Sequence, residues 1–268
     1  MTAQLQKYNI LLIGDTCWDD YVFVESTRKN PENDSPLLTQ INSLRYSGMV
    51  HNVHRCLVNL MLNVTTVFPL DSQMSVKTRY IDIDSGEHIC RVDKDIITTP
   101  INNISEFSFN QYDCVVISDY NKGYITTDTI KDIRKRFDGS IFLDTKKTNL
   151  TDFRGCFIKI NSAEAKVADS LPAGTVVTQG NLGATLMDHM YNDTWPALDV
   201  ECLDVCGAGD AFLAGYVYGW LETKDIVKAI RYGIVNSGIS VTKSGTYAPL
   251  LEDFERGLEQ YAKQYGES

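Results

Sequence analysis

The sequence predicts an α/β fold, in which a mostly parallel sheet lies between two layers of helices and carries a small accessory sheet. From Asp113 onward, short apolar runs alternate with helical segments, which is the pattern of a parallel sheet covered on both faces. Before Asp113 the strand candidates mix polar and apolar residues, as expected of an accessory sheet or lid inserted into that core. A chain of 268 residues corresponds to one large domain, or to one domain plus a small appendage.

The N-terminal elements begin with Asn9–Ile13, an apolar run that predicts a buried strand. Short mixed strands are expected at Val22–Glu25 and Leu38–Ser43, on either side of a stretch rich in Pro and Asn. The spacing of apolar residues predicts a helix over Val50–Leu62. Three more strands are expected, the last two alternating like an exposed hairpin: Val64–Phe68, Lys77–Ile83 and His88–Asp93.

The C-terminal half repeats the order of strand and helix. Strands are expected at Cys114–Ser118, Ile141–Asp144, Phe157–Ile160 and Thr175–Thr178. Helices are expected at Thr127–Phe137, Ala208–Leu221, Asp225–Thr242 and Leu251–Gln264. Ligands of open α/β sheets bind beyond the carboxyl ends of the strands, and four polar residues fall at such ends: Asp15, Asp119, Asp144 and Asn161.

Composition and charge exclude several classes of protein. The chain has 25 Lys and Arg against 35 Asp and Glu, a net charge of −10, which disfavours nucleic acid and anionic membranes as partners. The first residues lack the basic region of a signal peptide, and their apolar run is too short to span a bilayer. The seven cysteines include no CxxC pair, so we expect reduced thiols in a cytoplasmic protein.

The strongest chemical signal is Asp204-Val-Cys-Gly-Ala-Gly-Asp210, which an apolar helical run follows. Gly207, Ala208 and Gly209 would expose N–H groups at a helix N-terminus, where the helix dipole favours an anion. Asp210, just inside that positive end, is expected to have a lowered pKa and to accept a hydroxyl proton while the amides hold a phosphoryl group. A glycine-rich helix start with an acidic residue is also a common structural feature, so the motif alone leaves both interpretations open.

The motif resembles the DTxGAGD signature of the ribokinase-like (PfkB) carbohydrate kinases. Four other stretches match that family in the correct order: Ile13-Gly14-Asp15 with the following WDDYVF, Ser47-Gly48 to Asn52, Asn161-Ser-Ala-Glu164, and Thr178-Gln-Gly-Asn-Leu-Gly183. The resemblance implies a ribokinase-like three-layer α/β/α core with a mostly parallel sheet and a small β lid. It also implies one kinase domain over residues 1–268, with lid strands inserted at about 22–43 and 77–93, and ATP and Mg²⁺ as cofactors.

Within the family, the sequence is similar to the bacterial D-glycero-β-D-manno-heptose 7-phosphate kinases. Their TSRxSPEAPVPV segment resembles Ser26-Thr-Arg-Lys-Asn-Pro-Glu32 with Ser35-Pro36, and their SDYAKG resembles Ser118-Asp-Tyr-Asn-Lys-Gly123. Their LIDPKG resembles Phe142-Leu-Asp-Thr-Lys-Lys147, and their basic pattern resembles Lys77, Arg79, Arg91 and Asp93. The resemblance implies the kinase domain only, without a cytidylyl- or adenylyltransferase half.

Three departures from the family pattern bear on activity and specificity. Cys206 replaces the signature threonine, which keeps the small size but loses a hydroxyl. A single Gly48, between Ser47 and Met49, replaces a double glycine, so a side chain there can crowd the sugar or change which sugar fits. The stretch from Phe68 to Val76 is shorter than the corresponding family region.

The resemblance implies a role for each matching residue. Asp210 would be the catalytic base, with the amides of Gly207, Ala208 and Gly209 as its anion-binding site. Asn161 and Glu164 would hold Mg²⁺ largely through water, although the same pair can form a helix capping box. The adenine nucleotide would be bordered by Thr178, Gly180, Gly183, Asn236, Gly238 and Gly245. The sugar phosphate would be bound by Asp15, Gly48, Asn52, Lys77, Arg79, Arg91, Asp119 and Lys122, with a solvated strand face as the alternative for the basic residues.

These roles describe an ATP-dependent kinase that converts D-glycero-β-D-manno-heptose 7-phosphate to the 1,7-bisphosphate. One alternative is another sugar or sugar phosphate, such as fructose 6-phosphate or a pentose. The other is a catalytically idle sensor of a sugar phosphate or nucleotide on the same fold. Exposed lid strands need covering, so we expect a homodimer formed through them.

Overall fold

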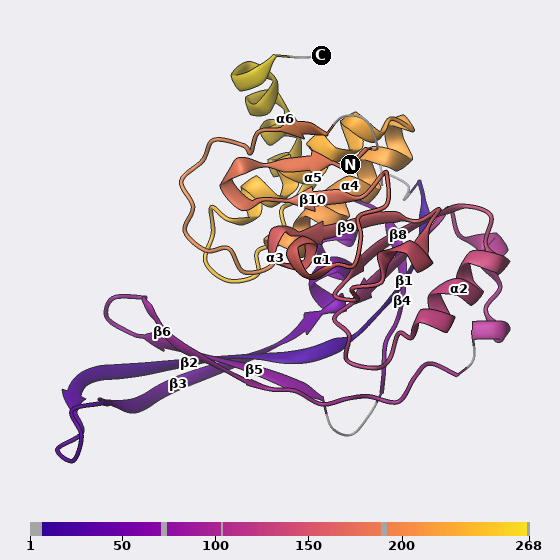
Figure 1. The fold of residues 1–268 in the computed structure, drawn as a ribbon. Helices are drawn as coiled ribbons and strands as arrows, with labels where there is room; N and C mark the ends of the chain where they lie inside the picture. Colours follow the sequence, from indigo (N-terminus) through magenta and orange to yellow (C-terminus); the bar gives the residue numbers. More distant parts are fainter. Residues whose placement is uncertain (1–6, 71–73, 103, 189–191, 267–268) are drawn as a thin grey trace, which may run out of the picture.

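The core of the protein is a sheet whose strands send side chains into two separate hydrophobic layers. The computed structural model describes residues 7–70, 74–102, 104–188 and 192–266 (Figure 1). In strand β1 (Asn9–Gly14), which lies between β7 and β4, Ile10 and Leu12 enter one core, whereas Leu11 and Ile13 enter the other. The alternation follows from the two-residue period of a strand, and it explains why β1 is apolar on both faces.

The main sheet has eight strands among the described residues, in the order β12-β11-β10-β9-β8-β7-β1-β4. The strands from β4 to β10 in that order are parallel, whereas β11 and β12 are antiparallel additions at one edge. Their bounds are Asn63–Val67 (β4), Cys114–Asp119 (β7), Ser140–Thr145 (β8), Phe157–Asn161 (β9), Val176–Thr178 (β10), Ala184–Leu186 (β11) and Asp193–Trp195 (β12).

Helices cover both faces of this sheet. One layer contains α1 (Val50–Asn59), α4 (Ala208–Thr223), α5 (Ile226–Ser240) and α6 (Leu251–Tyr265). The other contains α2 (Thr127–Arg136) and short 3-10 turns: η1 (Ile104–Glu106), η2 (Phe109–Gln111) and η3 (Leu150–Phe153). Two short elements, α3 (Ser162–Val167) and η4 (Gly180–Leu182), follow the carboxyl ends of β9 and β10. The three-layer α/β/α fold class predicted from the sequence is confirmed.

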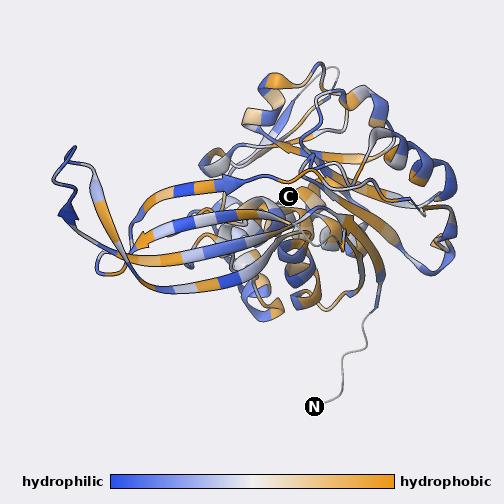
Figure 2. Cartoon of the chain, turned by 90° about the horizontal axis from the view of Figure 1, so that it is seen from below, coloured by the Kyte–Doolittle hydropathy of each residue, from blue (hydrophilic) through white to orange (hydrophobic). Residues whose placement is uncertain are grey.

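A second sheet extends from the body as an arm (Figure 1). It consists of β2 (Thr16–Lys29), β3 (Pro36–Met49), β5 (Ser75–Asp82) and β6 (His88–Lys94), in the order β3-β2-β5-β6. Polar and apolar residues alternate along these strands, as Figure 2 shows, while the strands of the main sheet are more uniformly apolar. The alternation reflects the position of the arm, which has far less of the body packed against it than the main sheet has.

Several expected boundaries were wrong for physical reasons. β2 and β3 are much longer than the predicted strands, because they pair with each other over nearly their whole length despite their polar residues. The predicted helix over Val50–Leu62 ends at Asn59, because Met61 adopts a left-handed conformation (φ 62°) and its N–H bonds to the Val58 carbonyl. The short strands β11 and β12 were not predicted, whereas α3 is the capped helix that was the alternative for Asn161 and Glu164.

The stretch from Phe68 to Val76, expected to be shortened, includes residues 71–73, which lie outside the described part of the chain. No helix in the described ranges is long and apolar enough to cross a membrane. All seven cysteines are free thiols, as expected.

Candidate active site

Two neighbouring cavities lie at the carboxyl end of the main sheet, and Gly209 at the start of α4 lines both of them. The larger has a volume of about 400 Å³ and the smaller about 160 Å³. This is the position at which open α/β sheets bind ligands. The two cavities differ in chemistry, since the larger is mainly apolar and the smaller is lined by charged groups.

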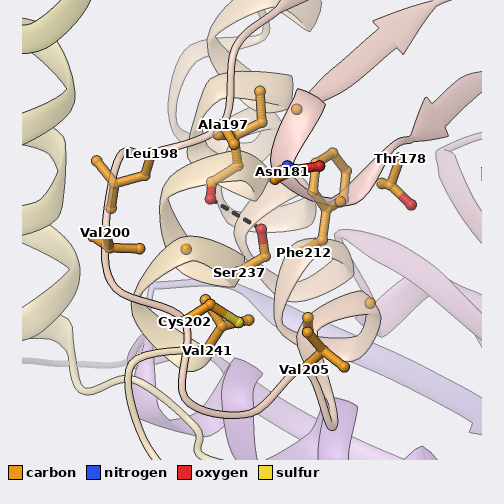
Figure 3. A pocket seen from close by; sticks show the side chains of 16 residues that line it. Thr178, Asn181, Ala197, Leu198, Val200, Cys202, Val205, Phe212, Ser237 and Val241 are labelled. Carbon is orange, nitrogen blue, oxygen red and sulfur yellow. Dashed lines mark hydrogen bonds between the residues drawn. The ribbon is translucent and has the colours of Figure 1, made fainter.

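The larger cavity lies between α4, α5 and the segment around Leu198 (Figure 3). Its walls include Phe212, Leu198, Val200 and Val241, whose side chains face a common space in Figure 3. Four of the predicted nucleotide residues line it: Thr178, Gly180, Gly183 and Gly238. An enclosed apolar space of this kind suits a flat aromatic ring with a few polar edges.

Two other predicted nucleotide residues do not line either cavity. Asn236 is fully buried, and its side-chain amide donates to the Ala211 carbonyl (2.8 Å), so it joins α5 to α4. Gly245 has a φ of 76°, and its N–H donates to Asp204 Oδ2 (2.8 Å). Both residues therefore hold together the elements around the cavity and do not themselves line it.

The start of α4 stands between the two cavities. Gly207 is the N-cap in a left-handed conformation (φ 78°), and Ala211 N–H makes the first helical bond to its carbonyl (2.9 Å). Of the three predicted anion-binding amides, Ala208 N–H already donates to the Val205 carbonyl (3.2 Å). A Cβ atom on Gly209 would lie 3.0 Å from Lys159 Nζ, so this glycine leaves space beside a cation. A glycine-lined helix N-terminus next to an ammonium group is a suitable place for a phosphate.

Asp210 is buried on the first turn of α4, with 4% of its surface exposed. Tyr120 hydroxyl donates to its Oδ1 (2.8 Å), and Asn52 Nδ2 donates to its Oδ2 (3.0 Å). Burial, followed by the nearby charge of Asp144, raises the pKa of Asp210 above its ordinary value. The expectation of a lowered pKa was wrong, because it considered the helix N-terminus and not the loss of solvent.

Asn52 is itself held by a residue that the sequence analysis missed. Arg55, one turn further along α1, donates to Asn52 Oδ1 (2.6 Å), to the Ser47 carbonyl (3.0 Å) and to Thr246 Oγ1 (3.1 Å). Because Arg55 is a donor only, the oxygen of the Asn52 amide must face it and the nitrogen must face Asp210. The guanidinium therefore fixes the orientation of the group that contacts the buried carboxylate.

The smaller cavity is polar, and it contains a buried ion pair between Lys159 and Asp144 (2.8 Å). Asn161 and Glu164 also line it, and they form the capping box considered above: the Glu164 carboxylate accepts from Asn161 N–H (2.8 Å). Burial raises the pKa of Glu164. No group of three or more His, Cys, Asp and Glu in the described residues could hold a metal by itself. Oxygen ligands from one or two residues nevertheless fit Mg²⁺, which is usually bound together with substrate phosphates and water.

Asp15 lies between β1 and β2, where the body meets the arm. Its Oδ2 accepts from the N–H groups of Tyr120 (2.7 Å) and Lys122 (3.3 Å), while its buried Oδ1 has no partner among the described residues. Burial, followed by the charge of Asp119, raises the pKa of Asp15. Asp119 was also predicted to bind substrate, but its carboxylate already has partners within the chain. It accepts a hydrogen bond from Thr145 Oγ1 (2.6 Å) and forms an ion pair with Lys147 (2.9 Å).

The turn from Ser47 to Asn52 has an unusual backbone. Gly48 cannot carry a side chain here, since a Cβ atom would lie 2.1 Å from Asp19 Oδ2. Met49, which follows Gly48, adopts φ 56° and ψ −119°, a conformation that side-chain-bearing residues rarely take. A side-chain-bearing residue thus occupies a backbone conformation suited to glycine, directly before α1.

The predicted basic residues differ in how far their charge is already neutralised. Arg79 is buried and paired with Asp19 (2.6 Å), Arg91 is exposed and paired with Asp93 (2.9 Å), and Lys122 is paired with Asp95 (2.7 Å). Lys77 makes no salt bridge to a described residue, and its ammonium lies 4.8 Å from the ring centroid of Tyr120. Lys146, which lines the smaller cavity, lies 4.7 Å from the same centroid.

The fold is that of the ribokinase-like sugar kinases. A ribokinase from Thermotoga maritima superposes with a TM-score of 0.70 at 16% identity, over 94% of this chain and 100% of that one. Phosphofructokinase-2 from Escherichia coli superposes with a TM-score of 0.73 at 15% identity, over 96% and 100% of the two chains. Residues 143–253 match the model of the pfkB family carbohydrate kinases. The resemblance to that family is thereby confirmed over residues 143–253.

Sequence comparison with curated proteins gives relatives that match over nearly the whole of this chain. The bifunctional protein HldE of Helicobacter pylori (strain J99) is 26% identical over 308 residues, which cover 94% of this chain and 66% of the relative. HldE of a Nitratiruptor species is 25% identical over 300 residues, which cover 93% of this chain and 64% of the relative. The chain therefore spans just under two thirds of the length of these curated relatives.

Proposed function

We propose that the protein transfers the γ-phosphate of ATP to a hydroxyl of D-glycero-β-D-manno-heptose 7-phosphate, giving the 1,7-bisphosphate. The observation that carries the proposal is the position of Asp210: a buried, hydrogen-bonded carboxylate on the first turn of a helix whose glycine-rich N-terminus separates an apolar cavity from a polar one. A proton acceptor, a phosphate site and a pocket for an aromatic ring are thus adjacent, as phosphoryl transfer from ATP requires.

On the donor side, the adenine ring of ATP occupies the larger cavity, next to Phe212 and Gly238. The phosphates extend past Gly209 toward Lys159 and Lys146 in the smaller cavity. Asn161 and Glu164 would hold Mg²⁺ largely through water, and the ion supplies neutralisation of the phosphate charge when bound. The lysines and the helix N-terminus contribute to the same neutralisation with groups that are already in place.

On the acceptor side, the unpartnered Oδ1 of Asp15 accepts a hydrogen bond from a sugar hydroxyl. Asn52 orients the base, and Asp210 accepts the proton of the attacking hydroxyl, a contribution of about 10²–10⁴ to the rate. The cation of Lys77 faces this region from the arm, without a carboxylate partner among the described residues. A free ammonium at that place supports an acceptor that already carries a phosphate.

The choice of heptose rests on the SDYNKG and Ser26–Pro36 resemblances, and the turn at Met49 favours one alternative. Met49 occupies a backbone conformation suited to glycine, with its side chain buried beside the proposed acceptor site. A side chain there can select another sugar or sugar phosphate, such as fructose 6-phosphate or a pentose. The acceptor panel described below includes both.

The arm acts as the lid of a single kinase domain, and we propose that it also forms a homodimer. β3 and β6 are the edge strands of the arm, and they carry apolar side chains that are about half exposed, such as Ile41 and Val92. Exposed edges and apolar side chains are costly for a monomer, and a two-fold pair of arms would cover both.

The test is ADP release by the purified protein with Mg-ATP and a panel of acceptors that includes heptose 7-phosphate, fructose 6-phosphate and pentoses. We expect turnover with heptose 7-phosphate that falls by about 10²–10⁴-fold in Asp210→Asn. Turnover with a different acceptor would keep the kinase and reject the heptose. If no acceptor gives turnover but ATP or a sugar phosphate raises the melting temperature, a sensor function replaces the enzyme.

A further inference from the structure

Tyr120 contacts both carboxylates of the proposed acceptor site. It follows β7 directly, and its N–H donates to Asp15 Oδ2 (2.7 Å) while its hydroxyl donates to Asp210 Oδ1 (2.8 Å). Its ring also makes cation–π contacts with the ammonium groups of Lys77 from the arm and Lys146 from the body, which lie 4.8 Å and 4.7 Å from the ring centroid. No other described residue makes hydrogen bonds to both Asp15 and Asp210.

We propose that Tyr120 is a positioning residue for the base: its hydroxyl holds Asp210 in the ionised state and in one rotational orientation during phosphoryl transfer. The inference rests on the proposed function, because it assumes that Asp210 is the base. Tyr120 is a positioning residue and not a catalytic one, since it acts through the carboxylate that it contacts.

The orientation follows from the two donors on opposite oxygens. With Tyr120 on Oδ1 and Asn52 on Oδ2, the carboxylate cannot rotate about its Cβ–Cγ bond without breaking both hydrogen bonds. Each oxygen retains a further lone pair, so a substrate hydroxyl can still donate to the group. A fixed base avoids the entropy that a rotating one would lose in the transition state.

The charge state follows from the direction of the hydrogen bond. A phenol that donates to a carboxylate stabilises the ionised form, which opposes the effect of burial on Asp210. Burial and the charge of Asp210 raise the pKa of Tyr120 well above its ordinary value, so the phenol keeps its proton and stays a donor. The other titratable groups around the pair are Asp144, Lys159, Lys77, Lys146, Cys17 and Cys56.

The first test is Tyr120→Phe, which removes the hydroxyl and keeps the ring beneath the two lysines. We expect kcat to fall about 10-fold, and the acid limb of the pH profile of kcat/KM to move up by about one pH unit, because the ionised base loses a hydrogen bond. The KM for ATP should not change. A structural role alone would lower activity without moving the acid limb.

Tyr247→Phe is the matched control, because it also removes a tyrosine hydroxyl that donates to a carboxylate, Asp253 (2.7 Å). Its acid limb should stay at the wild-type pH. If Tyr120→Phe leaves the acid limb unchanged while Asp210→Asn abolishes turnover, the proposal for Tyr120 is overturned and the proposed function stands. If Tyr120→Phe does not fold, 3-fluorotyrosine at position 120, a stronger donor, should move the acid limb downward.

A measurement that needs no acceptor tests the proposal for Tyr120 separately from the proposed kinase function. Urea unfolding of wild type, Tyr120→Phe, Asp210→Asn and the double variant at pH 8 gives the coupling between the two side chains. Coupled effects on the unfolding midpoint support the hydrogen bond even if no acceptor gives turnover, whereas additive effects overturn it.

Discussion

Asp210, which we propose is the catalytic base, lowers the stability of the fold when it is ionised. The ionised carboxylate is buried with two hydrogen bonds and no cation as a direct partner among the described residues. Its raised pKa means that the folded state binds the proton more tightly than the unfolded state does. Ionisation therefore destabilises the fold, and this loss develops as the pH rises from the ordinary aspartate pKa through the raised one.

Asp210→Asn is accordingly expected to be inactive and yet more stable than wild type at neutral pH. The amide keeps the size of the side chain and removes the buried charge. Thermal unfolding measured from pH 4 to pH 8 should show a stability advantage for the variant that grows with pH and then levels off. A variant less stable than wild type at pH 8 would contradict the pKa direction.

Arg55 is expected to determine how well Asn52 serves the base. Arg55→Met leaves Asn52 Oδ1 without its donor, so the amide can turn its oxygen toward Asp210. We expect kcat/KM for the sugar to fall about 10-fold, the cost of one hydrogen bond in a charged network. Steady-state kinetics measure this, with Arg136→Met, an exposed arginine on α2, as the control. Equal activity of both variants would remove Arg55 from the site.

At this scale, the sequence predicted the residues whose signal is local. Asp210 and the glycines before it stand in one motif, and the left-handed Gly207 and the start of α4 agree with it. Tyr120 and Lys159 were not predicted as site residues, because their partners, Asp210 and Asp144, come from other elements. Arg55 was missed although Asn52 lies only one turn away on α1, because nothing in the local pattern shows that Asn52 faces the site. The sign of the Asp210 pKa shift was missed for the same reason, since burial is a property of the folded chain.

Among the elements, the junction of β3 and α1 connects the arm to the helix whose Asn52 contacts Asp210. Gly48 faces Asp19 of β2, and Asp19 holds the buried Arg79 of β5 at 2.6 Å. One glycine thus allows three strands of the arm and the N-terminus of α1 to approach each other. The strain at Met49, just before the helix, adds about 1–3 kcal/mol that the surrounding packing must offset.

Gly48→Ala is expected to displace Asp19 and break its pairing with Arg79. Removing one partner of a buried ion pair costs about 3–5 kcal/mol, and a displacement should cost a fraction of this. The melting temperature should fall and the KM for the sugar should rise, with the KM for ATP unchanged. Gly86→Asn, in the open turn between β5 and β6 where φ is 72°, is the control that should behave as wild type. An unchanged melting temperature for Gly48→Ala would disprove the close contact.

The helices and strands were predicted best where a long run of the sequence is apolar. β1, β7 and α4 are predominantly apolar and appear close to where the pattern places them. β2 and β3 were predicted far too short, because strand pairing extends them through runs of consecutive polar residues, such as the end of β2. β11 and β12, of three residues each, depend on their neighbours in the sheet and have no independent signal.

For the molecule as a whole, the arm has two edge strands with exposed apolar side chains that no other part of the described chain covers. If two arms pair, Ile41→Glu and Val92→Glu should shift the protein from dimer to monomer, because each places a charge in the contact. Analytical ultracentrifugation over a range of concentrations measures this. Leu250→Glu, at a similarly exposed apolar residue before α6, should leave the mass unchanged. A wild-type monomer at all concentrations would reject pairing through the arms.

The attachment of the arm has a mechanical consequence. Only Asp15 separates β1 from β2, β3 runs directly into α1, and the two junctions are bonded by Val50 N–H to the Asp15 carbonyl (3.1 Å). If the arm swings, these junctions are its pivot, and displacement is smallest at a pivot and greatest at the far tip. The chain has placed Asp15, Gly48 and Asn52 at that pivot. We expect that such a swing would open the proposed lid widely for sugar exchange, while the residues that we propose bind the sugar would hardly move.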